Sequence, residues 1–374
     1  MMRKASFVDS TLVTGFPSYT ARRMVLKLLD SDPREQVFLL TRDKNAAEAE
    51  EFVGGLAPAL RKRVRMLVGD VSSMDLGLSG KEYRTLASEL TNIHHMAAHL
   101  HLGARKEVVQ QVNVGGTRGV LELALECRRL RRFNFWSTVA VSGDRQGVIM
   151  EDELVCDQRF NNHYEHSKYA AEKIVRSMSR RVPSTIYRPG VIVGDSRTGE
   201  IDRFDGPYHL MVLIVDSPVD VHLPLPGKGN APLHLVPVDH VIDAAHLLSR
   251  MEQTVSKTFH LVDPCPLSAS SIYQLVAERA HRKPPRGVIP AGLARTLLRL
   301  PGLSKIGASG TRSFLEGFER DVYYNCRNTL EALRGTDVWC PAFETYVDNL
   351  VRYVKDVRAA RRRRLDDDVT DPLD

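Results

Sequence analysis

The sequence predicts an α/β protein, built on a doubly wound parallel sheet of the Rossmann type with a smaller C-terminal cap. Three observations support this fold class. Strand and helix patterns alternate through the first half of the chain, a glycine-containing turn follows the first strand pattern, and Gly, Pro and Asp become frequent after Gly194. Such alternation is typical of βαβ units, whose crossover helices place successive strands in one parallel sheet.

The expected elements follow in chain order. Short apolar runs predict strands at 11–14, 37–41, 64–68, 92–97, 133–138 and 184–188. Apolar residues at helical spacing predict helices between them, at 21–30, 45–60, 80–90, 105–130 and 164–181. A helix pattern followed by a strand pattern lies near 236–262, and the spacing over 343–358 predicts a closing helix.

These elements divide the chain into a sheet domain and a cap. We expect residues 1–195 to form the sheet domain, completed by 233–263. Residues 196–232 and 264–345 are expected to form a cap that binds the substrate, and 346–374 a C-terminal helix with a charged tail.

Two apolar segments of the cap allow more than one interpretation. Residues 208–215 either line a pocket for an acyl chain or pack in the core. Residues 292–307, apolar with arginines, either pack within the cap or contact a lipid surface or a long substrate, and cap packing is the favoured alternative.

The composition indicates a large buried core and reduced cysteines. Of the 374 residues, 43% are hydrophobic, and no apolar run reaches the roughly 18 residues of a membrane-spanning helix. The N-terminus lacks the apolar segment of a signal peptide, which favours a cytoplasmic location. The five cysteines form no C-x-x-C pair, so free thiols are expected rather than disulfides or a zinc site.

The net charge of +6 suits a phosphate-bearing small molecule as well as nucleic acid. In 358–374 an arginine run meets an acidic one, with five charges of each sign. We interpret this segment as a solvated helix end and tail, with contact to nucleic acid or acidic lipid as the less favoured alternative. The expected partner is a small-molecule substrate and not nucleic acid, and the chain is expected to be a monomer or a homodimer.

The turn after the first strand keeps part of a dinucleotide-binding pattern. The places of G-x-x-G-x-x-G hold Gly15, Ser18 and Ala21. Glycine lets the backbone approach a pyrophosphate, and the helix N-terminus offers free N–H groups and a partial positive charge. The Ser18 hydroxyl could itself donate to a phosphate, and Ala21 is small enough for close packing. The residues expected to hold the dinucleotide here are Gly15, Phe16, Pro17, Ser18, Tyr19 and Thr20.

Two further positions bear on which dinucleotide binds. Arg42 follows the second strand, where a carboxylate would select NAD and an arginine suits the 2′-phosphate of NADP. Asp43 comes next, and a solvated strand end is the alternative. Asp70, after the third strand, either hydrogen-bonds the adenine with Val71 against the ring or caps its own loop. We therefore expect NADPH as the cofactor.

The stretch "YEHSK" carries the strongest chemical signal. Tyr164 and Lys168 are four residues apart, so on one helix they share a face. A neighbouring ammonium stabilises a phenolate and is expected to lower the pKa of the tyrosine towards neutrality. The strand upstream ends in Ser137 and Thr138, either of which could hydrogen-bond a substrate carbonyl. This order of residues predicts a catalytic set.

These residues resemble the short-chain dehydrogenase/reductase (SDR) superfamily, in its extended, epimerase/dehydratase-like branch. The resemblance extends over essentially the whole chain and includes the motifs at 14–21, 94–98, 112–117 and 188–194. It implies Thr138 as the catalytic hydroxyl with Ser137 as its substitute, Tyr164 as acid/base, and Lys168 as its partner, which also holds the nicotinamide ribose. It further implies cofactor contacts from Ala97, Ala98, Asn113, Arg188, Pro189, Gly190 and Val191. Asn113 would bend its helix and help fix the lysine; the alternative is a helix-surface amide.

Within that branch, the D-L-G-L-S segment at 75–79 resembles the thioester-reductase and fatty-acyl-CoA reductase group with a male sterility-type NAD-binding domain. This resemblance implies NADPH-dependent reduction of a CoA-bound or carrier-protein-bound acyl thioester to an aldehyde, sometimes onward to an alcohol. No adenylation or carrier domain accompanies the chain, so a stand-alone reductase is expected.

Other functions stay open at this point. A nucleotide-sugar dehydratase would have an Asp-Glu pair where Val139 and Ala140 follow Thr138, and an epimerase would favour an acid at Arg42. A steroid- or flavonol-type alcohol dehydrogenase needs the same catalytic trio, and a dinucleotide-sensing regulator would bind NADPH without turnover.

Two groups of residues have simpler interpretations. The histidines at 94, 95, 99 and 101 are not expected to bind a metal, and His94 or His95 is expected to pack near the cofactor. Asp239 is expected to cap the helix that follows it.

Overall fold

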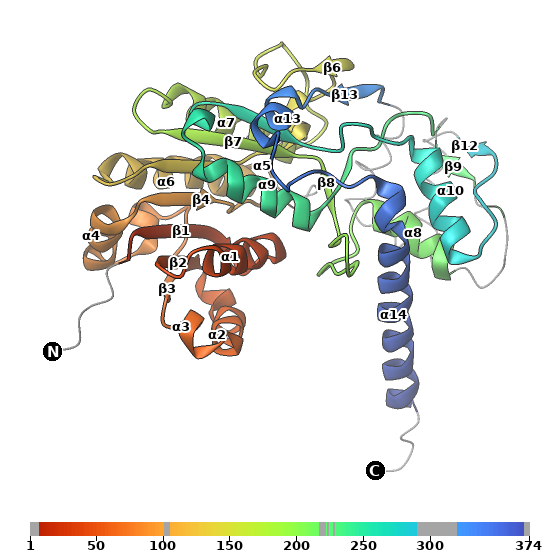
Figure 1. The fold of residues 1–374 in the computed structure, drawn as a ribbon, viewed down its shortest axis with the longest axis horizontal. Coiled ribbons are helices and arrows are strands. Elements are labelled where there is room, and N and C mark those ends of the chain that lie inside the picture. The colour runs from red at the N-terminus through yellow and green to blue at the C-terminus, as the bar shows by residue number, and fades with distance from the viewer. Residues whose placement is uncertain are drawn as a thin grey trace.

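A seven-stranded parallel sheet forms the centre of the computed structural model, which describes residues 7–100, 105–216, 222, 224–226, 229–289 and 320–369 (Figure 1). Its strands are β1 (Asp9–Phe16), β2 (Glu35–Thr41), β3 (Val64–Val68), β4 (Asn92–His95), β5 (Arg132–Trp136), β7 (Ser184–Pro189) and β11 (Thr258–Leu261). The spatial order of the strands is β11-β7-β5-β4-β1-β2-β3. From β1 the chain adds β2 and β3 on one side, and it then adds β4, β5, β7 and β11 on the other side. This doubly wound order confirms the predicted fold class, and its C-terminal edge is where such sheets bind ligands.

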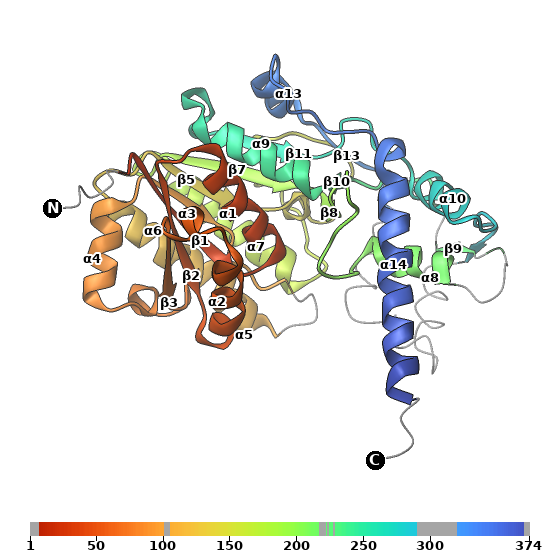
Figure 2. The ribbon, with the colours of Figure 1, turned by 60° about the horizontal axis from the view of Figure 1, so that its bottom comes forward.

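Helices cover both faces of the sheet (Figure 2). On one face lie α1 (Tyr19–Ser31), α2 (Ala46–Gly55) and α9 (Val238–Arg250); on the other lie α4 (Gly80–Glu89), α6 (Gly116–Glu126) and α7 (His163–Ser177). Successive strand residues alternate between the two layers, so Leu12 packs under α4 and α6 while Val13 packs under α1 and α9. Burial on both faces explains why the strands read as continuous apolar runs.

Two predicted helices are interrupted. The helix expected at 105–130 consists of α5 (Lys106–Val109), a π-helical turn (Gln110–Gly115) and α6. The helix expected at 45–60 consists of a short 3₁₀ turn, α2, and the separate α3 (Pro58–Arg61), which begins at a proline.

Two predicted strands end early. The strands expected at 92–97 and 133–138 stop at His95 and Trp136. The residues that follow them, which include the candidate site residues, therefore lie on loops at the C-terminal edge of the sheet.

The cap has a core of its own. Helices α8 (Pro207–Asp216), α10 (Ala269–Ala280) and α14 (Phe343–Val369) enclose buried side chains that include Tyr208, Tyr273 and Tyr346. Within 208–215, Tyr208, Met211, Ile214 and Val215 are core residues. The first turns of α14 pack in the cap and the helix continues through the arginine run, so the expected end at 358 was too early (Figure 1). Residues 292–307, His101 and 370–374 lie outside the described residues.

Three short parallel pairs of strands join segments of the described chain that lie far apart in the sequence. They are β8 (Val191–Val193) with β10 (Leu235–Pro237), β6 (Gly147–Ile149) with β13 (Val322–Tyr324), and β9 (Leu225–Pro226) with β12 (Val288–Ile289). Another helix of the described residues, α13 (Arg327–Leu333), packs beside α9. None of these pairs has a sequence pattern long enough to predict.

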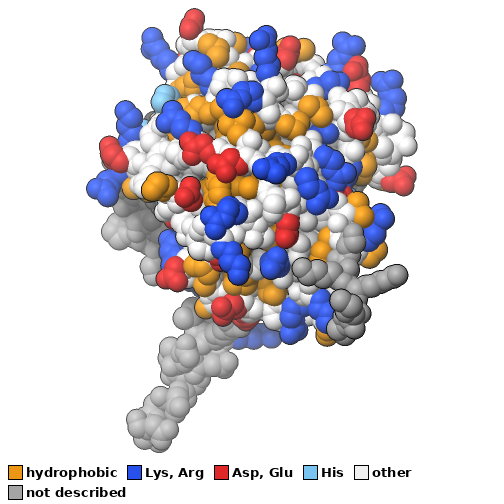
Figure 3. All heavy atoms as spheres, turned by 90° about the vertical axis from the view of Figure 1, so that its left-hand side faces the viewer, with side chains coloured by type: hydrophobic (Ala, Val, Ile, Leu, Met, Phe, Trp, Pro, Cys, Tyr) orange, Lys and Arg blue, Asp and Glu red, His pale blue; other side chains and the backbone are white. Residues whose placement is uncertain are grey.

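The surface of the sheet domain has no evident single-sign stripe on the side shown in Figure 3, where Lys and Arg side chains are interspersed with Asp and Glu. Within the described part of the chain, no helix combines the length and apolar character that crossing a bilayer requires.

Candidate active site

The end of β5 faces the helix α7, and the predicted catalytic residues meet there. The Lys168 amine donates a hydrogen bond of 2.6 Å to the Trp136 carbonyl and lies 4.7 Å from the centre of the Phe135 ring. The Tyr164 phenol hydrogen-bonds with the side chain of Thr138. Tyr164 and Lys168 thus point from one face of α7 to the same loop, as their spacing predicts.

The electrostatics of this pair differ from the sequence-based expectation. Burial raises the pKa of Tyr164 to about 12, and the hydrogen bond from Thr138 lowers it only in part. The Lys168 amine is directed to the Trp136 carbonyl, so the expectation that it lowers the pKa of the phenol is wrong for this arrangement. Burial lowers the pKa of Lys168 to about 8, and the nearby Glu172 carboxylate raises it.

The two adjacent hydroxyls have different partners. Ser137 is buried, and its hydroxyl donates a bond of 2.6 Å to the carboxylate of Glu172. Thr138 is only partly buried and contacts Tyr164, while its oxygen also accepts from the Ala140 N–H at 3.2 Å. Of the two candidates, Thr138 is therefore the hydroxyl that lies beside the Tyr164 phenol.

Asn113 lies inside the π-helical turn and is buried, so it is not the surface amide that the sequence left open. Its amide donates to Ser167 at 2.8 Å and to the His99 carbonyl at 3.3 Å, and its oxygen accepts from the His99 N–H at 2.6 Å. Since Ser167 precedes Lys168, Asn113 joins the loop after β4 to the catalytic helix. A π turn often marks a functional position of this kind.

The turn between β1 and α1 fits an anionic ligand. Gly15 has φ +82°, and a Cβ there would lie 2.7 Å from the Ala97 nitrogen, so only glycine allows β1 and the loop of Ala97 and Ala98 to approach. Ser18 precedes α1 without a side-chain cap bond, and the first turn, which includes Thr20, holds no acidic residue. The first N–H groups of α1 are therefore free of side-chain caps and suited to a pyrophosphate.

Other residues of the turn are engaged elsewhere. Phe16 and Pro17 are buried, and the Phe16 ring lies 5.3 Å from that of Phe52, so these two offer a ligand mainly their backbone. The Tyr19 hydroxyl donates to the Glu200 carbonyl at 2.8 Å and thereby reaches the loop that leads to the cap.

Arg42 is exposed at the end of β2. The register pairs Phe16 with Thr41, so Arg42 follows directly beside the turn. This position is compatible with a 2′-phosphate on a ribose bound across the edge of the sheet.

Asp70 caps its own loop, the second of the two roles that the sequence left open, and the adenine contact stays a prediction. Its carboxylate accepts from the N–H and the hydroxyl of Ser72 at 2.9 and 2.6 Å, which caps its own loop. Val71 is buried against α6, where a Cβ on Gly116 would lie 2.7 Å from its methyl group. The Val71 side chain is therefore mainly a packing residue.

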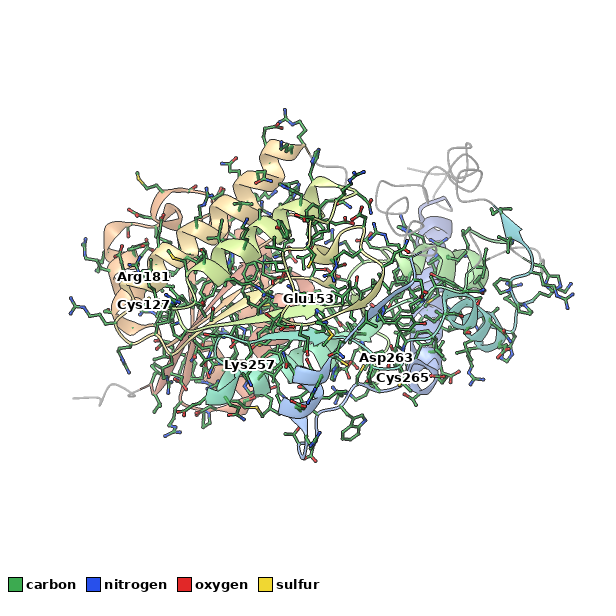
Figure 4. The ribbon with its side chains drawn as sticks, turned by 90° about the horizontal axis from the view of Figure 1, so that it is seen from above. Cys127, Glu153, Arg181, Lys257, Asp263 and Cys265 are labelled. Carbon is green, nitrogen blue, oxygen red and sulfur yellow. The ribbon has the colours of Figure 1, made fainter. Side chains whose placement is uncertain are left out.

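The side chain of Arg188 lies in the interior instead of at the edge of the sheet. It forms an ion pair of 2.6 Å with Glu172 and contacts His260 at 3.2 Å and the Glu153 carbonyl at 2.8 Å. Figure 4 labels Glu153 near the middle of the molecule. Arg188 can therefore offer a cofactor no more than its backbone. Pro189 ends β7, Gly190 follows it, and Val191 begins β8.

The two histidines of β4 are core residues. His95 hydrogen-bonds with Thr14 at 2.9 Å and with Thr117 at 3.1 Å, and His94 accepts from the Trp136 indole at 3.3 Å. Burial lowers the pKa of each to about 3, so both are neutral at physiological pH. Among the residues that the structure describes, no group of three side chains is placed to hold a metal ion.

The expected helix cap at Asp239 is wrong. Helix α9 begins at Val238 with Pro237 before it, and Asp239 accepts from the N–H and hydroxyl of Ser196 at 2.8 and 2.6 Å. Its role is to hold the loop at the start of the cap.

One buried acid of the site was missed by the sequence analysis. Glu172 lies one helical turn beyond Lys168, as Lys168 lies one turn beyond Tyr164. The signal was available as a third position on the same helix face, but its partners come from the loop after β5 and from β7.

Known proteins resemble the chain in sequence and in fold. A family model of NAD-binding proteins, described as male sterility protein, matches residues 13–245. A protein of linear gramicidin synthase from Brevibacillus parabrevis is 27% identical over 275 residues, 68% of this chain and 5% of the relative. Fatty acyl-CoA reductase wat of Drosophila melanogaster is 25% identical over 272 residues, 62% of this chain and 52% of the relative. The chain thus spans only part of the length of these curated relatives.

A solved structure matches nearly the whole chain. The terminal R domain from the myxalamid PKS-NRPS biosynthetic pathway superposes with a TM-score of 0.79 at 27% identity, over 94% of this chain and 91% of that one.

Proposed function

Because the chain belongs to the male sterility protein family of NAD-binding proteins, we propose that it reduces an acyl thioester with NADPH. It is an NAD(P)-dependent oxidoreductase of the extended SDR type, as the family and its structural match indicate. The observation that carries the proposal is the convergence of Thr138, Tyr164 and Lys168 at the end of β5. The aldehyde and ketone are the next substrates in order of preference.

NADPH, when bound, supplies a hydride to the carbonyl carbon. Thr138 and Tyr164 hydrogen-bond the carbonyl oxygen, and Tyr164 delivers the proton from its phenol. The raised pKa of Tyr164 suits this role, because the phenol is protonated at neutral pH. With a thioester, the net change consumes a hydride and a proton and yields an aldehyde and a thiol.

Cofactor binding is assigned to the edge of the sheet. The uncapped N-terminus of α1 takes the pyrophosphate, Arg42 the 2′-phosphate, and Lys168 the nicotinamide ribose. In this proposal residues 1–195 with 233–263 bind NADPH, and the cap binds the acyl group.

The substrate class is supported by the relatives. One matched relative is named a fatty acyl-CoA reductase, and another belongs to linear gramicidin synthase. A thioester carried by CoA or by a carrier protein is common to such chemistry, so we propose one of these carriers for this chain.

The test follows NADPH absorbance with acyl-CoAs of several chain lengths, acylated carrier protein, aldehydes and nucleotide sugars, for the wild type and Tyr164→Phe. We expect oxidation of NADPH with acyl thioesters. Removal of the phenol should lower the rate by about 10²–10⁴-fold, the usual contribution of a positioned acid, while NADPH still binds.

Turnover of nucleotide sugars alone would contradict the proposal and favour an epimerase or dehydratase. Binding of NADPH without oxidation by any carbonyl compound, and unchanged in Tyr164→Phe, would favour a dinucleotide sensor.

A further inference from the structure

A buried carboxylate lies one turn beyond Lys168 on α7. Glu172 is 0% exposed, and its oxygens accept from Ser137 at 2.6 Å, from Arg188 at 2.6 and 3.0 Å, and from Arg176 at 3.0 Å. The acid is thus bonded to the loop after β5, to β7 and to its own helix.

The two arginines are themselves anchored beyond the site. Arg188 also donates to the Glu153 carbonyl, labelled in Figure 4, and Arg176 donates to the Asp152 carbonyl at 2.6 Å and to Thr258 at 3.0 Å. Glu172 therefore has a fixed position, set by partners on several elements. A buried ion pair of this kind is weak evidence for stability, since apolar residues of the same volume often serve as well. A role in the candidate active site explains the buried Glu172 ion pair better than a contribution to stability does.

The bond to Ser137 links Glu172 to both catalytic contacts. Ser137 is the middle residue of three: the carbonyl of Trp136 before it accepts from Lys168, and the side chain of Thr138 after it contacts Tyr164. Fixing the middle residue fixes both neighbours. Because catalytic geometry is sensitive to small displacements, the support of this tripeptide matters to the reaction.

We propose that Glu172 is a positioning residue: it holds Trp136, Ser137 and Thr138 in register with α7 and places a negative charge one helical turn from Lys168. The proposal rests on the proposed function for the roles of Thr138 and Lys168, and it adds the residue that arranges them. It also assigns Ser137 to the support of the site and not to the substrate.

The charges around Lys168 support the electrostatic part. From its own helix, Tyr164 and Glu172 face it, and Glu172 raises a pKa that burial has lowered to about 8. From β4, His95 faces it but is neutral, because burial lowers its pKa to about 3. From β7, Arg188 lies behind Glu172 and carries the opposite charge.

The main experiment compares Glu172→Gln with the wild type. The amide keeps the size and can keep a hydrogen bond but removes the negative charge, so the protonated lysine loses stabilisation. A lower pKa of Lys168 moves the alkaline limb of each profile to lower pH, by about one unit. The readouts are the pH dependence of the NADPH dissociation constant, from nucleotide fluorescence, and the pH profile of acyl-CoA-dependent NADPH oxidation.

A matched control is Glu35→Gln. Glu35 is also fully buried and paired with an arginine, Arg250, but lies at the start of β2, on the opposite edge of the sheet. This variant should lose stability and keep both pH profiles. If Glu172→Gln likewise keeps both pH profiles and only lowers activity by the same factor at every pH, the role of Glu172 is structural and the proposal is overturned.

Two further variants decide the question should Glu172→Gln fail to fold. Glu172→Asp keeps the charge, so its alkaline limb should stay near that of the wild type while its rate falls; a shifted limb would contradict the proposal. Ser137→Ala removes one bond and no charge, and it should lose less than about tenfold in rate, against about 10²–10³ for a lost oxyanion donor. Equal losses in Ser137→Ala and Thr138→Ala would make Ser137 a substrate-binding hydroxyl and refute its supporting role.

The binding readout separates this inference from the proposed function. A shift in the pH dependence of NADPH binding without turnover of any acyl thioester would retain the role of Glu172 and reject the substrate. Turnover of an acyl thioester by Glu172→Gln with both pH profiles unshifted would retain the proposed substrate and reject the role of Glu172.

Discussion

At the residue scale, Arg42 is the side chain that we propose selects NADPH at the edge of the sheet. Its guanidinium is exposed beside the turn, where the register of β1 and β2 places it. A guanidinium binds a phosphate through charge-assisted hydrogen bonds, which NADH cannot form because it lacks the 2′-phosphate. The selectivity for NADPH should therefore depend on this one side chain.

We predict that Arg42→Ala weakens NADPH binding by about tenfold or more, the loss of a charge-assisted contact, and leaves NADH binding nearly unchanged. The measurement is a fluorescence titration with each nucleotide. Lys62→Ala, which removes an exposed cation at the end of α3, serves as the control. An equal loss for both nucleotides would show that Arg42 does not read the phosphate.

Single residues also show which features of the site can be predicted from the sequence. The spacing of Tyr164 and Lys168 fixes their common face, because helix geometry is local. The partner of Lys168 is a carbonyl, which no residue type reveals. The ion pair of Glu172 and Arg188 joins a helix to a strand and follows only from the packed structure.

At the element scale, the interrupted helix after β4 carries information that periodicity hides. The apolar pattern over 105–130 predicts one continuous helix, yet a π turn separates α5 from α6. The turn places Asn113 inside, where its amide satisfies both backbone groups of His99. A pattern averaged over several turns does not resolve one extra residue in the helix, so periodicity alone misses the π turn, whereas the family resemblance implied a bend at Asn113.

We predict that Asn113→Ala destabilises the protein and lowers turnover together. It removes the hydrogen bonds to the partly buried backbone of His99 and to the buried Ser167, at a cost of about 1–3 kcal/mol in the free energy of unfolding. It also releases α7 beside Lys168. The measurements are urea unfolding and the rate of NADPH oxidation.

The control for this variant comes from the same π turn. Gln110→Ala removes an exposed bond of 3.2 Å to His166 on α7, and it should change neither quantity by much. Equal effects of the two variants would show that the turn as a whole, and not the buried amide, supports the helix.

At the scale of the whole molecule, the loop 195–200 connects helix α1 with the cap. Arg23 of α1 forms an ion pair with Asp195, and Asn349 of α14 donates to the Ser196 carbonyl at 2.7 Å. Gly199 lies so close to α14 that a Cβ would lie 2.2 Å from the Asn349 carbonyl oxygen. One short loop is therefore held at once by the first helix and by the last.

The change of texture after Gly194 predicts the start of a cap, but the sequence does not predict how the loop that follows is held. The contacts of the loop, however, join residues far apart in the chain, and a sequence alone gives no register between α1 and α14. The same reason explains why Asp239 looked like a helix cap, although its partner is Ser196 of this loop.

The last prediction tests whether this loop couples the cap to the cofactor helix. We predict that Arg23→Ala costs about 1–3 kcal/mol in the free energy of unfolding, because it leaves the largely buried Asp195 with a weaker partner. Amide exchange should accelerate in 195–200 and at the start of α14, and KM for the acyl substrate should rise more than the NADPH dissociation constant. If amide exchange accelerated only in α1, the loop would not couple the cap to this helix.

The pH dependence of this effect has a definite sign. Burial raises the pKa of Asp195, but the hydrogen bond from the Arg197 backbone and the charge of Arg23 outweigh it and lower the pKa below its usual value. The stabilisation by a carboxylate with a lowered pKa is present at neutral pH and is lost as the pH falls through the folded-state value. The stability difference between the wild type and Arg23→Ala should therefore narrow in acid, and a difference that widens would mean that Asp195 is not the partner responsible.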